Sequence, residues 1–537
     1  MSIVDIRCKR GKFLSMLVFT AVLTLLFSVS NTDCKTFYID PQNGSIDNDG
    51  SKMAPWSTLK EVFNSGKIQT RDWASKPPQS TTQLVLKNVD GPVGPGDTLL
   101  LLTGYHGNVY ASGYYNQDFV TIMAAPGHKP RLAALELRSG CRWLIKGLTI
   151  SPSFSDSLFK TTLINFSSHG YNGNSYLCYA EENSGYSVED VSAWSLEDWN
   201  ALPSSAMSLP EKSVARRNYF KNVNFGISCG GDSSLIEYNT IENFAGDGLR
   251  GIGNYQVFQY NTIMNCYDVN ENHDDGFQSW STGDSGVGTG VVKGMILRGN
   301  TIINYTDINQ PFRGTLQGIG CFDGMFEDWV VENNIIAVDH WHGISLYGAK
   351  NCRVVNNTVV DLNSASPGPP WIKITEHKNG TSPVGCLVRN NLTTAISCSN
   401  TGVTIDNNII VKDYDTYFVD YSGGNFHLKD NCDAINAGVS EFAPEMDRDG
   451  IKRPVGSGID IGAYEFRPGS SSITLYWPVS NQILSTVKVF DLRGRCVSDV
   501  RNDRELITKG QLGTNLFLLH GQANHNSAVR HIFMRRR

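Results

Sequence analysis

Polar residues recur at matching positions in five short segments of the chain. In each segment the third residue is apolar, and most of the first and fourth residues are polar. The segments are Asp247–Arg250, Asp275–Gln278, Gln317–Gly320, His342–Ser345 and Pro370–Lys373. If they are strands of stacked coils, side-chain alternation points the third residue inward and puts the first and fourth on one outer face, with about 4.8 Å between coils. The pattern therefore predicts a polar column along that face.

Carboxylates gather at the start of this column. Asp274 stands beside Asp275, and Asp247 holds the equivalent position one segment earlier. Calcium takes about six to eight oxygen ligands in flexible geometry, and carboxylates this close repel each other unless a cation or a proton lies between them. We therefore expect a Ca²⁺ site, with ligands Asp247, Asp274, Asp275 and the amide oxygen of Gln278. The alternative is that Asp274 and Asp275 only cap a turn.

A second repeat predicts the elements that position the column. In seven places an Asn follows β-favouring residues and precedes a β-branched or apolar pair: Asn239, Asn261, Asn300, Asn334, Asn357, Asn391 and Asn408. Asn tolerates the left-handed backbone of a tight turn, and stacked Asn side chains can hydrogen-bond from coil to coil. One coil cannot bury its apolar residues alone, so coils must stack. The repeat predicts an all-β parallel β-helix, since the apolar spacing of a helical or leucine-rich solenoid is absent.

Several segments near the two ends of the repeat region match a known class of protein. They are Tyr38–Pro41, Asn48–Ser51 and Pro55–Leu59 at the start, Gly96–Leu99 with Gly104 in the first coil, and Ala434–Gly438 with Asp460–Glu465 at the end. Together they resemble the pectin-lyase-like β-helix proteins that bacteria secrete. The resemblance implies a right-handed parallel β-helix over residues 31–467, and it implies nothing about chemistry.

The first 30 residues have the composition of a signal peptide. They combine a basic start, the apolar run Phe13–Phe27 and small residues at Ser28–Ser30. The run is short for a membrane span of about 20 residues, so we expect cleavage and secretion rather than a membrane anchor. We expect no transmembrane segment in the mature protein, because no later stretch is long and apolar enough.

The composition changes again after Pro468. The segments Val487–Arg495, Gly513–Leu518 and Met534–Arg537 resemble the C-terminal sorting domain of the type nine secretion system. The resemblance implies that residues 468–537 form a small β-rich domain, which engages the secretion machinery and leads to release or tethering at the cell surface. The alternative is an ordinary small β-sandwich used for binding.

Residues 151–217 interrupt the repeat with a stretch rich in Ser, Tyr and Trp, including Trp194 and Trp199. A loop of this length in a repeat protein is usually functional. We expect it to form one wall of a substrate groove.

The two acidic segments also match a known calcium site. Asp247-Gly is followed one coil later by Asp-Asp-Gly-Phe-Gln over residues 274–278. This arrangement resembles the calcium site of family nine pectate lyases. The resemblance implies that Asp247, Asp274 and Asp275 are ligands and that Gln278 replaces an Asp of the family. The catalytic lysine of the family matches Gly320 here, so the resemblance assigns no base.

The resemblance implies β-elimination on a uronate polymer, which needs a cation on the carboxylate and a base for the C5 proton. By position, the catalytic candidates are Lys373, Arg313 and His342. A lysine base would need its pKa lowered by burial or by neighbouring cations. Arg250 is a candidate for a bidentate clamp on the substrate carboxylate. The plainer alternatives are that His342 is a satisfied coil histidine and that Lys373 is solvated.

Further candidates for substrate contact lie beside the column. Trp280 and Tyr347 fall at similar outward positions, where an aromatic face suits stacking on sugar, although aromatics are also common in cores. His340 shares a Trp-containing turn with His342 and is placed to stack on sugar or to protonate the leaving oxygen. Lys378 completes the set of expected substrate contacts.

The favoured interpretation is an extracellular polysaccharide lyase that uses calcium-assisted β-elimination on a pectate- or alginate-like polymer. A glycoside hydrolase is the first alternative, with Asp275 and either Asp323 or Glu327 flanking the glycosidic bond. A non-catalytic glycan-binding surface protein and an epimerase stay open, because β-helices support many chemistries.

Composition limits the partners. A net charge of −6 and a charged fraction of 18% argue against nucleic acid, whose binding needs a basic face. An acidic polysaccharide therefore requires locally placed cations. Cys8 lies in the predicted signal peptide, and the in-phase Cys352 and Cys386 predict mostly buried thiols. We expect a monomer without nucleotide, flavin or transition metal, since capped coils need no partner.

Overall fold

The computed structural model describes residues 34–399 and 401–468, together with four strands nearer the C-terminus. These strands are β44 (Thr486–Phe490), β45 (Cys496–Val500), β46 (Phe517–Gln522) and β47 (Val529–Met534), and they pair antiparallel in the order β45-β44-β46-β47. The sorting role of this tail stays a prediction, and the predicted signal peptide lies outside the described residues. None of the described helices has the length and apolar character needed to cross a membrane.

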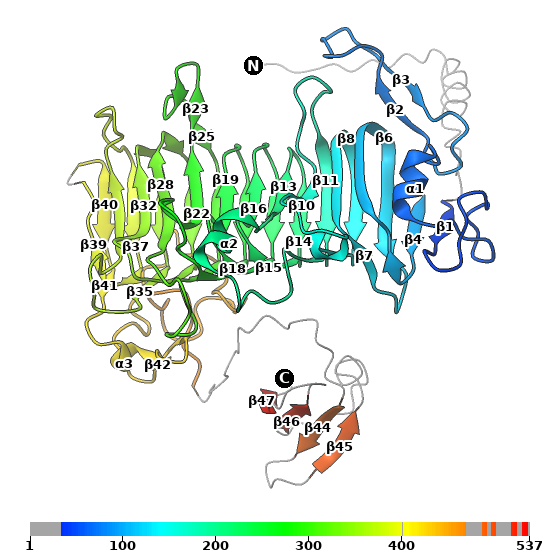
Figure 1. Cartoon of the computed structure of the whole chain (residues 1–537). Coiled ribbons are helices and arrows are strands. Elements are labelled where there is room, and N and C mark those ends of the chain that lie inside the picture. Colours follow the sequence, from blue (N-terminus) through cyan, green and yellow to red (C-terminus); the bar gives the residue numbers. More distant parts are fainter. Residues whose placement is uncertain are drawn as a thin grey trace, which may run out of the picture.

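Two parallel sheets, of 22 and 12 strands, wind around a common interior (Figure 1). The larger sheet begins with β1 (Thr36–Ile39), β4 (Thr98–Leu101), β6 (Asn108–Ala124) and β8 (Ala134–Lys146), and then divides into two ladders. The first ladder consists of β10 (Thr162–Asn165), β13 (Ser205–Leu209), β16 (Ile227–Cys229), β19 (Leu249–Gly251), β22 (Asp275–Trp280), β28 (Gln317–Asp323), β32 (His342–Tyr347), β36 (Trp371–Thr375) and β39 (Ala395–Ile396).

The other two ladders complete each coil. The second ladder consists of β11 (Tyr176–Glu181), β14 (Val214–Arg216), β17 (Leu235–Glu237), β20 (Val257–Gln259), β26 (Ile296–Arg298), β30 (Val330–Glu332), β34 (Arg353–Val355), β37 (Cys386–Arg389) and β40 (Val403–Asp406). The third ladder is the 12-stranded sheet: β5 (Gly104–Tyr105), β7 (Pro130–Leu132), β9 (Thr149–Ile150), β12 (Ser184–Tyr186), β15 (Tyr219–Val223), β18 (Thr240–Phe244), β21 (Thr262–Cys266), β27 (Thr301–Ile303), β31 (Ile335–Val338), β35 (Thr358–Asp361), β38 (Leu392–Thr393) and β41 (Ile409–Ile410).

Short elements lie outside the ladders. They are the hairpins β2 (Thr70–Trp73) with β3 (Leu84–Lys87), β23 (Thr282–Gly283) with β24 (Gly286–Val287), and β42 (Phe418–Asp420) with β43 (Asn425–Leu428), the small sheet of β25 (Val292–Lys293), β29 (Phe326–Glu327) and β33 (Ala349–Lys350), and the helices α1 (Leu59–Asn64), η1 (Pro152–Phe154), α2 (Leu196–Ala201) and α3 (Tyr414–Tyr417).

The interior is filled by apolar side chains that stack from coil to coil. Leu249, Phe277, Ile319, Ile344 and Ile372 are successive register partners along the first ladder, and each is at most 2% exposed. These are the third residues of the five polar segments, so their predicted inward direction is confirmed. Full burial of such a side chain contributes about 1.5–3 kcal/mol.

The repeated asparagines form one continuous ladder of side-chain hydrogen bonds. The Nδ2 atom of Asn300 donates to Oδ1 of Asn334 at 3.0 Å, and Oδ1 of Asn300 accepts from Nδ2 of Asn261 at 3.0 Å. The ladder begins two coils earlier than the repeat predicts, because Asn183 and Asn218 make the same bonds. The left-handed residue is the one before each repeated Asn, with φ from 53° to 60°. The turn and the ladder are therefore built by adjacent residues.

The expectation for residues 151–217 needs correction. Strands β10 to β14 lie in this segment and pair in register with their neighbours, as Met207 does with Ile227. Most of the segment therefore continues the coils. A shorter stretch that includes α2 leaves the coils, and there Trp199 stacks on Tyr267 with 4.3 Å between ring centroids. Irregular loop lengths hid the strands from the sequence pattern.

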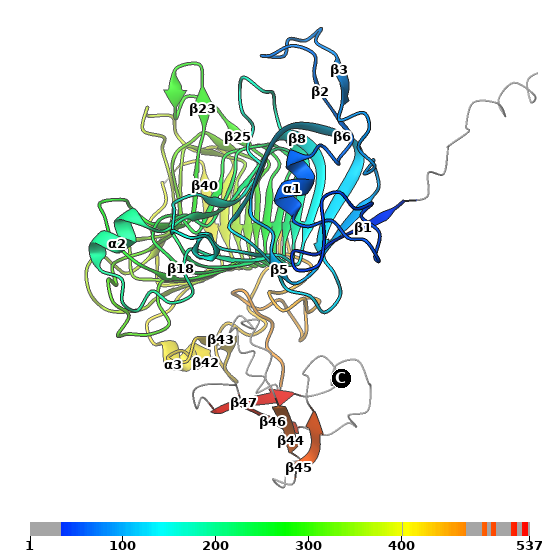
Figure 2. The same cartoon turned by 45° about the vertical axis from the view of Figure 1, so that its right-hand side comes forward.

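The N-terminal end and the asparagine side of the described coils are covered by other segments. Helix α1 lies at the N-terminal end, where Phe63 contacts the rings of Tyr114 and Trp143 (Figure 2). The segment 430–467 runs along the asparagine turns, and its buried Arg453 pairs with Glu465 at 2.6 Å and donates to Asn333. All ten described cysteines are free, and most are buried, including Cys352 and Cys386 as expected.

Candidate functional site

The predicted outer column forms along the first ladder. Its members are successive register partners: Arg250, Gln278, Gly320, Ser345 and Lys373. Asp275 is likewise the partner of Gln317, and His342 is the partner of Trp371. Because the residues between them are buried in the core, the column faces outward, as the sequence predicts.

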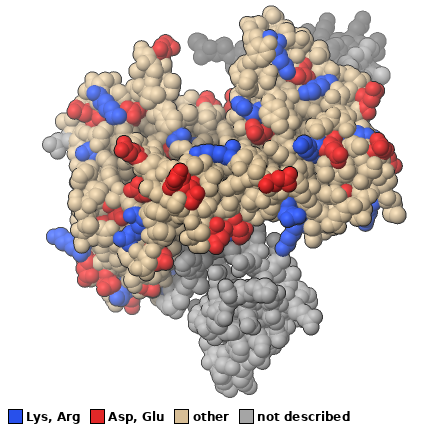
Figure 3. All heavy atoms as spheres, viewed as in Figure 1, with Lys and Arg blue, Asp and Glu red and all other residues tan. Residues whose placement is uncertain are grey.

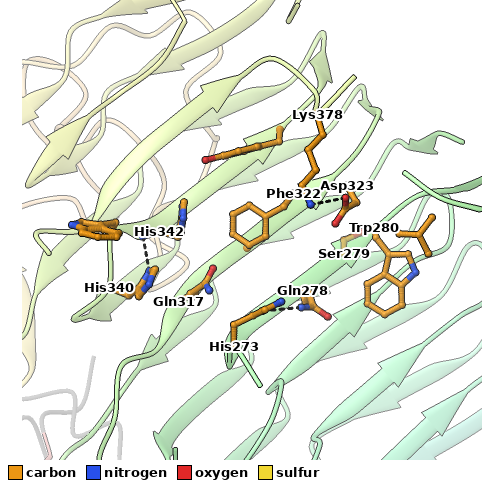
Figure 4. A pocket seen from close by; sticks show the side chains of 14 residues that line it. His273, Gln278, Ser279, Trp280, Gln317, Phe322, Asp323, His340, His342 and Lys378 are labelled. Atoms are coloured by element: carbon orange, nitrogen blue, oxygen red, sulfur yellow. Dashed lines mark hydrogen bonds and ion pairs between the residues drawn. The ribbon is translucent and has the colours of Figure 1, made fainter. Parts of the chain in front are cut away.

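A cavity of about 480 Å³ opens over β22, β28 and β32 (Figure 4). Imidazoles, amides and aromatic rings line it: His273, Gln278, Trp280, Gln317, Phe322, Asp323, His340, Trp341, His342, Tyr347 and Lys378 are among its residues. Val287 from the β23–β24 hairpin borders it. Aromatic faces mixed with hydrogen-bonding groups suit a sugar, which has apolar faces and polar edges.

Asp275 and His273 form a hydrogen-bonded pair at this cavity. The side chain of Asp275 is fully buried, and its Oδ2 lies 3.2 Å from Nδ1 of His273 and accepts from Nε2 of Gln278 at 3.0 Å. Burial raises the pKa of the Asp275 carboxyl, and the bond to Asp275 raises the pKa of His273. Since Nδ1 faces the carboxylate, Nε2 is the nitrogen left for a ligand. A histidine oriented by a carboxylate is a common general base.

The second oxygen of Asp275 explains why position 320 is glycine. This Oδ1 atom is buried without a hydrogen-bond partner. A Cβ atom on Gly320 would lie 1.9 Å from it. The carboxylate therefore occupies the space into which any side chain at position 320 would extend, and a lysine does not fit there.

Asp247 fixes Arg250 beside the cavity. Its Oδ2 accepts from Nε of Arg250 at 3.0 Å and also from Nη2, while its Oδ1 accepts from the Asp275 amide at 3.2 Å. Burial raises the pKa of Asp247 against the opposite effect of Arg250. The guanidinium lies 4.6 Å from the ring of Phe225 and 5.1 Å from that of Trp280. Arg250 is thereby held rigidly, with one face turned to an aromatic residue of the cavity.

Asp274 faces away from these two carboxylates. It accepts from Nδ2 of Asn272 at 2.8 Å, and the Cys266 thiol lies 3.4 Å from its Oδ2. Burial raises the pKa of Asp274 to about 7. Its carboxyl group is therefore protonated in a large part of the molecules at neutral pH.

As placed, the three carboxylates do not fit a calcium ion. Each is turned to a different set of partners, and among the described residues no three His, Cys, Asp or Glu side chains are grouped closely enough to hold a metal ion. Arg250 also supplies a positive charge to Asp247 directly. The calcium requirement stays a prediction of the sequence, which chelation tests.

His342 is a neutral histidine with a defined tautomer. Its Nδ1 accepts from Nε1 of Trp371 at 3.3 Å and lies 2.8 Å from Oγ of Ser345. The indole nitrogen can only donate, so the proton of the neutral ring is on Nε2. Burial lowers the pKa of His342 to about 4, helped by His340 and Lys373. The ring can therefore donate a hydrogen bond at neutral pH, and it is a poor base.

His340 borders the same cavity and is also neutral. Its Nδ1 accepts from the backbone amide of His342 at 3.2 Å, and the two rings stack with 5.2 Å between centroids. Burial lowers the pKa of His340. Two neutral imidazoles, His340 and His342, thus face the same cavity as His273, whose pKa is raised.

The remaining predicted residues divide into two groups. Trp280, Tyr347 and Lys378 line the cavity, and Nζ of Lys378 pairs with Asp323 at 2.8 Å. Lys373 stands at the end of the column, with Nζ 4.7 Å from the ring of Trp371. Arg313 is not brought to the cavity. Its guanidinium donates to the Ile308 carbonyl and lies 4.7 Å from the ring of Tyr305, because it belongs to the loop between β27 and β28.

The sequence interpretation missed His273. Its signal was a histidine two residues before a buried Asp, at the start of a strand. The Asp274–Asp275 pair drew the interpretation toward a metal, and the register that puts His273 at the cavity is visible only in the fold. Asp323, proposed only for hydrolysis, also lines the cavity, whereas Glu327 lies on β29 and pairs with Lys350.

Charges on the face drawn in Figure 3 are sparse and mixed in sign. Lysine and arginine side chains stand singly among acidic ones, and the described residues on this face form no extended basic surface. Attraction of an acidic chain would therefore depend on individual cations such as Arg250 and Lys378.

Comparison with known proteins agrees with the topology. A family model described as a right handed beta helix region matches residues 208–367. The chain is a right-handed parallel β-helix. No curated protein matches it in sequence.

Several solved structures resemble this chain at low identity. Pectate lyase Pel9A is 16% identical, with 81% of this chain and 96% of that chain covered and a TM-score of 0.39. XylC in complex with xylose is 9% identical, with 80% and 98% covered and a TM-score of 0.45. A rhamnogalacturonan lyase is 12% identical, with 76% and 97% covered and a TM-score of 0.40. These similarities concern the fold alone.

Proposed function

We propose that this protein is an extracellular polysaccharide lyase that cleaves a uronate-containing polymer, pectate- or alginate-like, by β-elimination. The observation that supports the proposal most is the pair of His273 and Asp275 in an aromatic-lined cavity with cations at its edge. β-Elimination needs a base for the C5 proton, a positive charge on the carboxylate and a donor for the leaving oxygen. Each has a candidate side chain here.

His273 is the proposed base. Once Asp275 is ionised, above its raised pKa of about 8, Nδ1–H of His273 donates to this carboxylate and the lone pair of Nε2 is free to take the C5 proton. The buried carboxylate holds the ring in this tautomer and stabilises the imidazolium that forms. Lys373 and His342, the candidates by position, suit this step less well, because His342 has its acceptor nitrogen engaged and Lys373 lies two rungs beyond Gly320.

The other two tasks fall to residues on either side of His273. Arg250, or Lys378 at the opposite edge, would pair with the substrate carboxylate and stabilise the charge that develops when C5 loses its proton. Nε2–H of His342 would donate a hydrogen bond to the leaving oxygen. The C4–O bond then breaks, a double bond forms between C4 and C5, and the oxygen takes its proton from the His273 imidazolium.

Ultraviolet absorbance of the unsaturated product tests this proposal. The mature protein would be mixed with pectate, alginate and other uronate polymers, with added calcium and with chelator. A rise in absorbance that is lost in His273→Ala supports elimination by this residue. If chelator abolishes the rise in absorbance, the predicted calcium requirement is supported. If no polymer gives a rise, the lyase assignment is refuted.

A glycoside hydrolase is the second candidate, and the position of Asp323 favours it. This carboxylate lines the cavity and is about one-third exposed, while the pKa of Asp275 is raised as in a general acid. However, Asp275 is fully buried, so it reaches a substrate only through His273. New reducing ends without ultraviolet absorbance would move the assignment to hydrolysis.

We also propose that the protein is exported, loses residues 1–30 and is directed to the cell surface by residues 468–537. The support is the composition of the two ends of the chain. Mass spectrometry of the protein from culture medium and cell surface tests both cleavages, and light scattering tests the expected monomer. A retained N-terminus or a purely internal location would contradict this assignment.

A further inference from the structure

The outer column continues one coil beyond the cavity, to Lys373. The cavity lies over β22, β28 and β32 (Figure 4), and Lys373 on the following strand, β36, is the register partner of Ser345 on β32. Trp371, two residues earlier on β36, is likewise the partner of His342, which lines the cavity. The side chain of Lys373 therefore lies where a polymer that runs along the coil axis leaves the cavity.

Aromatic rings hold the Lys373 side chain in place. Its Nζ atom lies 4.7 Å from the centroid of the Trp371 ring and 5.9 Å from that of the Tyr347 ring. Trp371 is itself fixed, because its Nε1 donates to Nδ1 of His342 at 3.3 Å and its ring lies nearly parallel to that of Trp341, with 6.2 Å between centroids. The lysine side chain is half-buried. Its ammonium group is thus positioned before any ligand arrives, which reduces the entropy lost on binding.

This ammonium group has no anionic partner. Within the described residues it makes the two ring contacts and no ion pair or hydrogen bond. The neighbouring ladder is different, because its outward arginines pair with a carboxylate in register on the next coil: Arg216 with Glu237, Arg298 with Glu332 and Arg389 with Asp406. The register partner of Lys373 on the preceding coil is the uncharged Ser345. The coils therefore leave the charge of Lys373 uncompensated, although they compensate comparable cations on the next ladder.

The positive charge of Lys373 also acts on the cavity. Burial lowers the pKa of His342, and the charge of Lys373 contributes to the same shift. The two cations that border the cavity, Arg250 and Lys378, are each engaged by a carboxylate of the protein. An anionic group at this end of the column would therefore find in Lys373 a cation whose charge no carboxylate of the protein offsets.

Lys373 is too far from the proposed base to hold the carboxylate of the uronate that is cleaved. His273 precedes β22, and β36 lies three coils further along the axis, a separation of about 14 Å at about 4.8 Å per coil. In a uronate the carboxyl carbon is bonded directly to C5. One sugar unit therefore cannot place its C5 at His273 and its carboxylate at Lys373. An anion at Lys373 must belong to another unit of the same polymer.

We propose that Lys373 binds the carboxylate of a second uronate, a few units along the polymer from the one that His273 attacks. This inference rests on the proposed function, and it narrows the substrate class. The preferred polymer would have uronates at both positions, and a backbone in which single uronates are separated by long neutral stretches would bind less well. Trp341, which is 41% exposed and lines the cavity, would contact the units between the two carboxylates.

Binding of oligomers of increasing length tests this inference without turnover. Oligogalacturonates and alginate oligomers would be titrated calorimetrically into the mature protein with the substitution His273→Ala, which keeps the ligands intact. We expect the affinity to rise about tenfold once an oligomer is long enough to reach Lys373, as for one charge-assisted contact. Lys373→Gln in the same background should remove this gain, and Lys373→Arg should retain most of it.

Two controls accompany these variants. Oligomers too short to reach Lys373 should bind Lys373→Gln and its parent alike, which shows that the cavity is intact. Lys412→Gln, at an exposed lysine that follows β41 on the third ladder, removes the same charge away from the column and should leave the gain with length unchanged.

The outcomes separate this inference from the proposed function. Equal binding of long oligomers by Lys373→Gln and its parent would refute the second carboxylate site even if elimination is found. An equal gain with oligomers whose carboxylates have been reduced to alcohols would refute it too, because the contact would then not be ionic. Failure of every oligomer to bind would also overturn it. A gain that depends on Lys373, without elimination by the native protein on any polymer, would support the site and refute only the lyase.

Discussion

The asparagine turns and the outer column repeat from coil to coil in the same way, yet they treat polar groups differently. Along the turns each amide finds its donor and acceptor in the next coils, as Asn300 does with Asn334 and Asn261. In the column, Oδ1 of Asp275 and Oε1 of Gln317 are buried without partners. Each such group costs about 1–3 kcal/mol. The turns therefore stabilise the fold, whereas the column holds buried polar atoms whose hydrogen bonds the coils do not complete.

Removal of the proposed base gives the largest expected effect on activity with little effect on stability. His273→Ala should lower the elimination rate about a hundredfold to ten-thousandfold, the usual contribution of a general base. The thermal midpoint should hardly change, because the His273 side chain is 60% exposed. Initial rates and a melting curve measure the two quantities. His169→Ala, at an exposed histidine outside the cavity, is the control.

A substitution in the asparagine turns should instead lower stability and leave activity nearly unchanged. Asn300→Ala removes bonds to Asn334, Asn261 and the Phe258 carbonyl, and it leaves buried groups unpaired. The free energy of unfolding should fall by about 3 kcal/mol, as measured by chemical denaturation. The rate per folded molecule should stay within about twofold. A stable but inactive variant would show that the turns also serve the site.

Substitution of Asp275 should affect both activity and stability, and the two effects depend on pH in different ways. Because the carboxylate raises the pKa of His273, the free base accumulates only above the ordinary histidine value. The rate should rise with pH through that raised pKa. Asp275→Asn should lower the maximal rate about tenfold or more and shift the rising limb to lower pH. If the rising limb of the pH–rate profile does not move in Asp275→Asn, His273 is excluded as the base.

The same substitution should improve stability at high pH. Burial raises the pKa of Asp275 above its unfolded value, so the folded state holds the proton more tightly. The stability that comes from this proton is complete below the ordinary carboxyl pKa and is lost as the pH rises through the raised value. Asp275→Asn should therefore gain stability relative to the native protein as the pH increases. Denaturation curves at acidic and alkaline pH measure this difference.

The smallest expected effect concerns the aromatic side chains. Trp280→Ala removes a ring from the cavity and from contact with Arg250. We expect KM to rise about three- to tenfold, since one stacking contact contributes about 1 kcal/mol. Tyr110→Ala, at an exposed tyrosine on β6 far along the same sheet, should leave KM unchanged. An equal change in both variants would indicate a longer binding surface.

The fold was largely predictable because it depends on a local pattern. A strand, a turn residue and an Asn recur in sequence, and each coil repeats the solution of the previous one. Strands β10 to β14 escaped prediction because their coils have irregular loops and lack the repeated motif in full. The outer column was predictable as well, since alternation fixes which of Leu249 and Arg250 points outward.

The site was only partly predictable, because contacts across coils decide its chemistry. Nothing in the sequence shows that Asp247 turns to Arg250, or that Asp275 turns to His273 and fills the space at Gly320. Arg313 was assigned from its place in the chain, but the loop that bears it carries the guanidinium to Tyr305. Loop conformation and rotamer choice have no periodic signal, so such assignments need the structure.

The asparagine ladder has one more consequence, for how such a protein can change over generations. Rungs are joined across 39 residues between Asn261 and Asn300 and across only 17 between Asn391 and Asn408, with bonds of the same kind. Register is therefore set by the rung itself and not by the length of chain between rungs. Insertions can lengthen a hairpin such as β23–β24 while the strands of the coils from which it projects stay in register. The loops that border the site can therefore change, and the range of substrates with them, while the register of the coils is kept.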